Sequence, residues 1–235
     1  MIKIFLDTAD IKEIEKWSKD SLISGYTTNP SLAKKSGIKN YRDFMKTVLD
    51  IVGDEKPVSF EVLSNNREEI REQAFIISEF GKNVYVKIPI KNTDGEYLIG
   101  LIQSLSKRIN LNITAIMSVD QVRISSECLL YNNNKYILSM FAGRIADCGH
   151  NPRLAIAGAK REIEKHSLKN IELLWASTRE AYNIHDADTN HADIITCTPQ
   201  ILDKFIKLRN KNLEEYSVET AQMFYNDAIE SGLSL

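Results

Sequence analysis

The sequence predicts an α/β fold, a (β/α)8 TIM barrel with an extra C-terminal helix. Short runs rich in β-branched and aromatic residues alternate along the chain with amphipathic helical patterns. Such alternation is typical of parallel strands that are joined by helical crossovers. Eight strand runs fit within the 235 residues, and eight units of this length close into a barrel more readily than they form an open sheet.

Each predicted strand ends at a turn residue or where a helical pattern begins. The strands cover residues 2–6, 23–28, 57–63, 84–90, 111–117, 136–141, 171–176 and 193–197. The helices cover residues 10–19, 41–52, 67–80, 96–107, 120–130, 152–165 and 179–184, followed by one that begins near Pro199. Asp10 and Ser31 carry side chains of the kind that caps helix N-termini.

One more amphipathic pattern, over residues 217–231, follows the eighth unit. A helix at that point has no place in the ring, so we expect it to cover a barrel end or to contact a neighbouring subunit. The prediction is therefore a single barrel domain over residues 1–235, in which residues from about 212 on form a helical extension.

The composition is that of a soluble globular protein and disfavours several classes of function. Hydrophobic residues make up 43% and charged residues 26% of the chain, and the net charge of −2 gives no support for binding to nucleic acid or to an anionic membrane. The three cysteines, Cys128, Cys148 and Cys197, show no paired spacing, which predicts reduced thiols in a cytoplasmic protein. We find no apolar run long enough to span a bilayer, and the first residues indicate a strand rather than a signal peptide.

The most informative strand, over residues 84–90, carries a lysine inside the otherwise apolar run V-Y-V-K-I-P-I. Burial disfavours a charged ammonium group and so makes an amine a better nucleophile. Neutral lysines in apolar pockets form Schiff bases with carbonyl substrates. A lysine near a strand end can also extend its amine to solvent, so Lys87 alone does not decide between these interpretations.

Polar residues follow almost every predicted strand, at the end of the barrel where active sites of this fold lie. They are Asp7, Thr28, Asn29, Glu61, Lys87, Asn112, Thr114, Ser139, Arg144, Ser177 and Arg179. Single polar residues at strand ends are commonly caps and turns. However, Glu61 interrupts an apolar run, and Asn112 and Thr114 share one face of their strand. Together these residues favour a functional site over a set of structural turns.

These residue types suit the cleavage of a carbon–carbon bond next to a ketone. A Schiff base on Lys87 can serve as the electron sink, without a metal or any other cofactor. Asp7 and Glu61 can share the proton transfers, and Thr114 can hold a water. The remaining side chains supply groups that bind a sugar phosphate: Asn29 and Asn112 for hydroxyls, and Arg144, Ser177 and Arg179 for a phosphate.

Three stretches resemble the transaldolase family in its small-subunit form, which includes the fructose-6-phosphate aldolases. They are F-L-D-T-A over residues 5–9, T-T-N-P-S-L over 27–32 and V-K-I-P over 86–89. Weaker similarities follow in the same order at residues 61–62, 112–114, 141–144 and 176–179. The resemblance implies a class I aldolase that moves a dihydroxyacetone unit from a ketose phosphate, such as fructose 6-phosphate or sedoheptulose 7-phosphate, to an aldose phosphate.

The resemblance also implies residue roles. It places the Schiff base on Lys87, acid–base chemistry on Asp7, and a water relay on Glu61 and Thr114. The implied substrate-binding residues are Thr28, Asn29, Asn112, Ser139, Phe141, Arg144, Ser177 and Arg179. The implied partners are sugar-phosphate substrates and further copies of the chain, of which a decamer is one form.

Two alternatives to a transaldolase stay open. The first is an aldolase that releases free dihydroxyacetone, but the aldolase branch resembles this chain less at two positions, where it has Gln and Tyr in place of Glu61 and Phe141. The second is a non-catalytic sugar-phosphate-binding barrel, which is expected to lack the lysine or a carboxylate. Departures from the family pattern at residues 115–117 and 145–150 leave the acceptor sugar open.

The segment over residues 185–191 contains two histidines and two aspartates. These residue types can ligate a metal, but their spacing matches no established motif. We therefore predict a polar loop between the seventh and eighth strands and no metal site. The basic run over residues 204–211 is interpreted as a solvated face.

Overall fold

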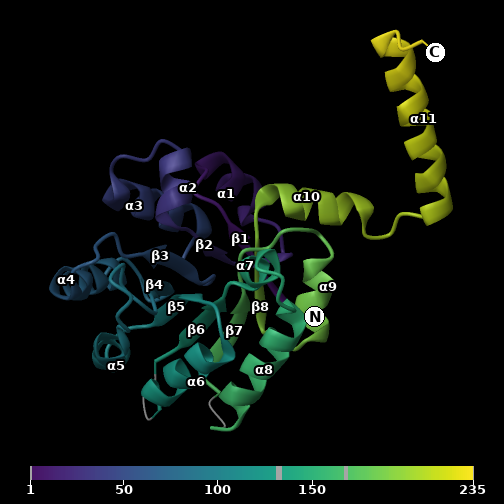
Figure 1. The fold of residues 1–235 in the computed structure, drawn as a ribbon. Helices are drawn as coiled ribbons and strands as arrows, with labels where there is room; N and C mark the ends of the chain where they lie inside the picture. Colours follow the sequence, from purple (N-terminus) through teal and green to yellow (C-terminus); the bar gives the residue numbers. More distant parts are fainter. Residues whose placement is uncertain (1, 131–133, 167–168, 235) are drawn as a thin grey trace.

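The computed structural model describes residues 2–130, 134–166 and 169–234. In this part of the chain, eight parallel strands close into a barrel in sequential order, with the last strand paired to the first (Figure 1). The strands are β1 (Lys3–Asp7), β2 (Ile23–Thr27), β3 (Val58–Glu61), β4 (Val84–Pro89), β5 (Leu111–Ile116), β6 (Tyr136–Met140), β7 (Ile171–Trp175) and β8 (Ile194–Cys197). The predicted (β/α)8 barrel is confirmed.

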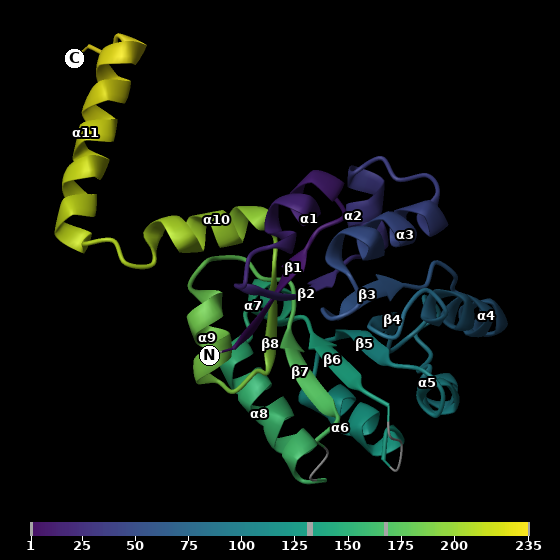
Figure 2. The same cartoon turned by 180° about the vertical axis from the view of Figure 1, so that it is seen from behind.

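Helices surround the strands and fill the crossovers (Figures 1 and 2). They are α1 (Ile11–Ser18), α2 (Pro30–Lys35), α3 (Tyr41–Val52), α4 (Arg67–Ser78), α5 (Ile99–Ser106), α6 (Val119–Cys128), α7 (Ala142–Asp147), α8 (Pro152–Glu164), α9 (Asn183–Thr189), α10 (Pro199–Leu208) and α11 (Leu213–Ser231). Asp10 caps α1 as predicted, since its carboxylate accepts the Lys12 N–H at 2.9 Å.

Several helical segments differ from the sequence prediction. The cap of α2 is Asn29 rather than Ser31, because Asn29 Oδ1 accepts the Leu32 N–H at 2.9 Å and Pro30 occupies the first helical position. The short helix α7 was not predicted, and it directly follows β6. The helix predicted over residues 179–184 begins only at Asn183 and runs to Thr189 as α9, so residues 185–191 do not form the predicted polar loop.

The barrel interior contains an apolar layer below the C-terminal ends of the strands. Its buried members are Phe5, Tyr85, Ile137, Leu174 and Ile194. An added Cβ atom at Gly25 would lie 2.6 Å from the Phe5 ring, so this ring fills the space beside β2. Side chains alternate along a strand, and Asp7 and Lys87 therefore lie one layer above Phe5 and Tyr85. The apolar layer forms a floor for these polar groups.

At the N-terminal ends of the strands, beyond this floor, lies a cavity of about 1080 Å³ with a charged lining. Three ion pairs bridge its wall, each with a nitrogen–oxygen distance of 2.6 Å: Lys3–Glu172, Lys82–Asp54 and Lys160–Asp193. Their charges are matched within the wall itself. This end of the barrel fold contributes mainly to stability rather than to catalysis.

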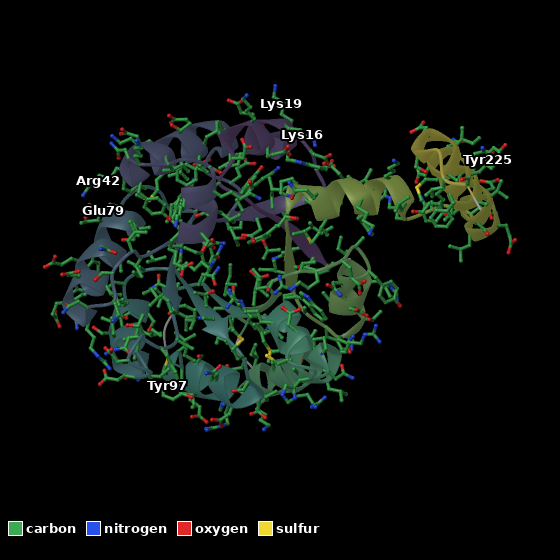
Figure 3. All side chains as sticks on the ribbon, turned by 45° about the horizontal axis from the view of Figure 1, so that its top comes forward. Lys16, Lys19, Arg42, Glu79, Tyr97 and Tyr225 are labelled. Carbon is green, nitrogen blue, oxygen red and sulfur yellow. The ribbon has the colours of Figure 1, made fainter. Side chains whose placement is uncertain are left out.

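Helix α11 extends away from the barrel, to which it is connected by α10 (Figures 1 and 2). It begins at Leu213, earlier than predicted, because Asn212 Oδ1 accepts the N–H groups of Glu214 and Glu215. No side chain of α11 is buried, and Figure 3 shows Tyr225 on this helix far from the ring. Among the described residues, no helix combines the length and the apolarity needed to cross a membrane.

Candidate active site

A cavity of about 520 Å³ opens at the C-terminal ends of the strands. Ten of the predicted site residues line it: Asp7, Asn29, Glu61, Lys87, Thr114, Ser139, Phe141, Arg144, Ser177 and Arg179. The parallel strands explain why residues so distant in sequence meet, because all strands end at the same rim of the barrel.

Lys87 lies at the centre of a short polar network. Its strand partner on β3 is Glu61, and Lys87 Nζ lies 3.1 Å from Glu61 Oε2. The same nitrogen donates a hydrogen bond to the carbonyl oxygen of Thr28 at 3.2 Å. The apolar neighbours that the sequence suggested, Val86 and Ile88, point outward to the core between strands and helices. The surroundings of the buried amine are therefore polar, because inward and outward positions alternate along the strand.

Asp7 ends β1 and carries the second carboxylate of the cavity. The Thr27 hydroxyl donates to Asp7 Oδ1 at 2.7 Å. Burial of the carboxyl group raises the pKa of Asp7 above its usual value, while the positive charge of Lys87 and the hydrogen bond from Thr27 offset part of this shift. The two carboxylates thus have different surroundings: Glu61 pairs with the amine, and Asp7 is held by a hydroxyl group.

Two predicted site residues lie outside the cavity lining. Thr28 is fully buried and its hydroxyl donates to the Ser59 carbonyl at 3.2 Å, so its side chain points away from the site. Its neighbour Thr27 takes the expected place, because Thr27 is the inward-facing residue at the end of β2. Asn112 is also fully buried, and its amide donates to Ser59 Oγ at 2.9 Å and accepts from Ser139 Oγ at 2.7 Å.

The end of β5 is irregular where it reaches the cavity. The pairing of β5 with β6 shifts register between Ile113 and Ile116, and Ala115 has a φ of 57°. This bulge directs both Thr114 and Ala115 into the cavity, although successive residues of a regular strand face opposite sides. Within the described part of the chain, the buried Thr114 hydroxyl has no hydrogen-bond partner. It can therefore hold a water or a substrate oxygen.

The two predicted phosphate-binding arginines lie on the same side of the cavity. Arg144 stacks its guanidinium group 5.5 Å from the centre of the Phe141 ring, and Arg179 forms an ion pair with Asp147 of α7. Gly143 permits this arrangement, since an added Cβ atom would lie 1.7 Å from the carbonyl oxygen of Ser177. Ser177 itself has a φ of 62°, in the left-handed region. The close approach of the Gly143 and Ser177 backbones thus positions the side of the cavity that carries the two arginines.

A sequence pattern described as "Transaldolase/Fructose-6-phosphate aldolase" matches residues 4–234. The chain belongs to this family. It is 33% identical over 209 residues to "Probable transaldolase" from Nitrosopumilus maritimus, a match that covers 88% of each chain. It is 30% identical over 224 residues to "Probable transaldolase" from Brucella ovis, covering 94% of this chain and 97% of the relative.

Solved structures of lower identity share only the fold with this transaldolase/aldolase family member. A dihydrodipicolinate synthase superimposes with a TM-score of 0.59 at 13% identity, over 97% of this chain and 81% of the other. Orotidine 5′-monophosphate decarboxylase from Metallosphaera sedula gives a TM-score of 0.56 at 13% identity, over 91% and 99% of the two chains. Both comparisons agree with the barrel described above.

Several residues around the family site were not predicted from the sequence. Thr196 lines the cavity next to Thr27, and Tyr41 accepts the backbone N–H of Glu61 on its hydroxyl oxygen at 3.1 Å. Burial raises the pKa of Tyr41, so its phenol stays neutral. Strand parity is a signal that could have indicated Thr27 and Thr196, whereas nothing in the sequence connects the first residue of α3 with Glu61.

Helix α9 supports the loop that carries Arg179. Asn183 Oδ1 accepts the backbone N–H groups of Arg179 and Glu180 at 3.1 and 3.2 Å. The buried Asp186 pairs with Arg153 at 2.7 Å. His185 is exposed, and the described residues include no group of three or more His, Cys, Asp or Glu side chains arranged to hold a metal ion. Asn183 and Asp186 of α9 thus hold the structure next to the site in place.

Proposed function

We propose that this chain is a cytoplasmic class I transaldolase that moves a dihydroxyacetone unit from a ketose phosphate, such as fructose 6-phosphate or sedoheptulose 7-phosphate, to an aldose phosphate. One observation carries the proposal: the amine of Lys87 lies 3.1 Å from the Glu61 carboxylate, in a cavity that also contains Asp7 and is closed below by an apolar floor. A nucleophile beside a proton acceptor, with a second carboxylate nearby, is what Schiff-base chemistry requires.

The proposed reaction begins when the Lys87 ammonium group gives a proton to Glu61. The neutral amine attacks the ketone carbon, and a proton returned by Glu61 lets the carbinolamine lose water and form the imine. Asp7 then takes the proton of the hydroxyl group on the carbon beyond the bond to be broken. That bond breaks, the aldose leaves, and its electron pair passes into an enamine on Lys87. Attack of the enamine on the acceptor aldehyde, followed by hydrolysis of the imine, completes the transfer.

The family membership alone allows a second function, that of an aldolase releasing free dihydroxyacetone. Transfer requires the enamine to survive until the acceptor arrives. Phe141 lines the cavity and offers no hydroxyl proton to the enamine, which supports transfer over release. Rates of transfer to erythrose 4-phosphate and of dihydroxyacetone release, measured side by side from fructose 6-phosphate, test this choice; faster release would contradict it.

Borohydride trapping tests the central proposal. The protein is incubated with fructose 6-phosphate or dihydroxyacetone, reduced, digested and mapped by mass spectrometry. We expect a three-carbon adduct on Lys87 and no adduct in Lys87→Ala. Lys91→Ala is a matched control, because Lys91 lies close in sequence but stacks on the ring of Tyr97, 4.3 Å from its centre, outside the cavity. An unmodified wild-type protein, or an adduct on another lysine, would refute the assignment.

We also propose that the chain assembles with copies of itself through α11. This helix exposes a series of apolar side chains, with Val218 70%, Phe224 62% and Ile229 60% accessible. Single exposed apolar residues are normal, but a helix that carries many of them and buries none of its side chains against the described part of the barrel presents a surface suited to a partner. Light scattering gives the mass directly. We expect an oligomer that dissociates in the double variant Phe224→Glu/Ile229→Glu; a monomeric wild-type protein would exclude this assembly.

A further inference from the structure

Three side chains from three strands form a chain of short contacts at the side of the cavity. Thr27 Oγ1 lies 2.7 Å from Asp7 Oδ1 and 2.6 Å from Thr196 Oγ1. Thr27 is 2% and Thr196 5% exposed, yet both line the cavity. Distances this short in a nearly dry environment require each contact to be a hydrogen bond with a defined donor.

The number of protons fixes which group donates and which accepts in each of these hydrogen bonds. An ionised carboxylate only accepts, so Thr27 must give its single hydroxyl proton to Asp7. The contact between the two threonines then needs its proton from Thr196. In this state both short contacts are satisfied, and all hydroxyl protons point toward the carboxylate.

Protonation of Asp7 weakens these contacts. With the proton on Oδ2, Asp7 Oδ1 still accepts from Thr27, but a neutral carbonyl oxygen is a poorer acceptor than a carboxylate oxygen. With the proton on Oδ1, both threonines would have to turn their hydroxyl protons away from Asp7, and the backbone acceptor closest to Thr196 Oγ1, the carbonyl oxygen of Phe5, lies 3.5 Å away, a distance at which little hydrogen-bond energy remains. The two protonation states of Asp7 are therefore unequal, and the chain favours the ionised one.

We infer that Thr196, acting through Thr27, is a positioning residue that keeps the carboxylate of Asp7 ionised and directed into the cavity, ready to accept a proton. The inference rests on the proposed function, in which Asp7 is the base for bond cleavage. The inference adds Thr196, from the eighth strand, to the site. It also explains why a hydroxyl group is buried at Thr27, where packing alone would accept an apolar side chain.

The other ionisable groups around Asp7 do not take over the role of the Thr196–Thr27 hydrogen bonds. Those that belong to the cavity or to the elements beside it are Lys87, Glu61, Arg144, Arg179, Cys197, Asp10 and Glu13. Lys87 favours the charged carboxylate, but it also pairs with Glu61. Burial raises the pKa of Cys197 to about 12, so this thiol is neutral. Asp10 and Glu13 hold α1, through Lys12 N–H and Trp17 Nε1.

The test compares the pH dependence of kcat/KM in four variants, with fructose 6-phosphate as donor and erythrose 4-phosphate as acceptor. Thr27→Val and Thr196→Val remove a hydroxyl at nearly constant volume, and Thr196→Ser keeps it. Thr47→Val is the matched control, because the Thr47 hydroxyl lies on the exposed face of α3 and donates to the Asp43 carbonyl. Without its donor the carboxylate is less stable, so protons bind it at higher pH. We expect the acid limb of the pH profile to rise by about one pH unit in Thr27→Val and Thr196→Val and to stay in place in Thr196→Ser and Thr47→Val.

A second readout does not depend on turnover. Carboxyl carbon NMR of aspartate-labelled protein, with Asp7 assigned by its absence from Asp7→Asn, follows the same titration directly, and Thr196→Val should shift it in the same direction. An unshifted acid limb and an unshifted Asp7 titration in Thr196→Val would overturn the inference. Failure of the proposed function is distinguishable, because wild-type protein would then give no borohydride adduct on Lys87 at any pH.

Discussion

Lys87 and Glu61 are directly paired residues on neighbouring strands, and their charged groups meet 3.1 Å apart with side-chain exposures of only 7% and 15%. A buried ion pair is costly to form and contributes little net stability, so its presence at the strand ends calls for a functional reason. In the proposed reaction the amine lies directly beside the group that accepts its proton. Catalysis then needs a single short proton transfer to produce the nucleophile.

The variant Glu61→Gln should slow formation of the imine without changing its site. The amide keeps the shape of the side chain but cannot accept a proton, and loss of such a group commonly lowers rates by about 10²- to 10⁴-fold. Borohydride trapping at timed intervals measures the rate. An adduct that forms on Lys87 as fast as in the wild type would show that Glu61 takes no part in the proton transfer.

The variant Asp7→Asn should be inactive but more stable than the wild type at neutral pH. Because burial raises the pKa of Asp7 in the folded state, the folded protein binds this proton more readily than the unfolded chain does. The corresponding stabilisation is present below the ordinary pKa and is lost as pH rises through the folded value. The advantage of Asp7→Asn in urea midpoint should therefore grow from acidic to neutral pH. An advantage that shrinks over this range would contradict the expected direction.

The variant Arg179→Ala should weaken the use of phosphorylated sugars and spare unphosphorylated ones. Arg179 and Arg144 stand on the same side of the cavity, and a guanidinium group binds phosphate in a bidentate manner. We expect KM for fructose 6-phosphate to rise about tenfold or more, since a charged hydrogen bond contributes roughly 1.5–3 kcal/mol. Steady-state kinetics with fructose 6-phosphate and with dihydroxyacetone compare the two classes. Arg123, half-exposed on α6 and paired there with Asp120 and Glu127, provides the control Arg123→Ala. Equal losses for both substrates would remove Arg179 from the phosphate site.

The variant Gly143→Ala should destabilise the protein and impair phosphate recognition together. The new Cβ atom would collide with the Ser177 carbonyl oxygen, only 1.7 Å away, and with the Ser177 carbonyl carbon at 2.8 Å. Such overpacking commonly costs about 1–3 kcal/mol. Gly100→Ala is the matched control, because nothing lies within 4 Å of its Cβ position in α5, and alanine is the better helix former. A Gly143→Ala protein as stable as the wild type in urea would refute the close approach.

The barrel was predictable because each strand has a local pattern that its tertiary position does not override. The run around Lys87 predicted β4, and the polar residues after it predicted the rim. What the sequence could not provide is the direction in which each side chain points. Thr28 was chosen where Thr27 faces the cavity, since the last residue of β2 could not be placed to within one position. Helix α9 was predicted too early, over residues 179–184, because the aspartates and histidines that follow have low helix propensity, whereas its buried face, Ile184 and Ala187, packs against the barrel.

The apolar floor beneath Lys87 has a kinetic consequence. The apolar floor around Phe5 closes the barrel axis below the amine. Donor, leaving aldose, acceptor and water therefore all use the opening at the C-terminal ends of the strands. In the proposed reaction the first sugar must depart before the second can enter, so initial rates plotted reciprocally against the two sugars should give parallel lines, the signature of double displacement. Water enters through the same opening. The lifetime of the enamine therefore decides whether the three-carbon unit is transferred to an acceptor or released as free dihydroxyacetone.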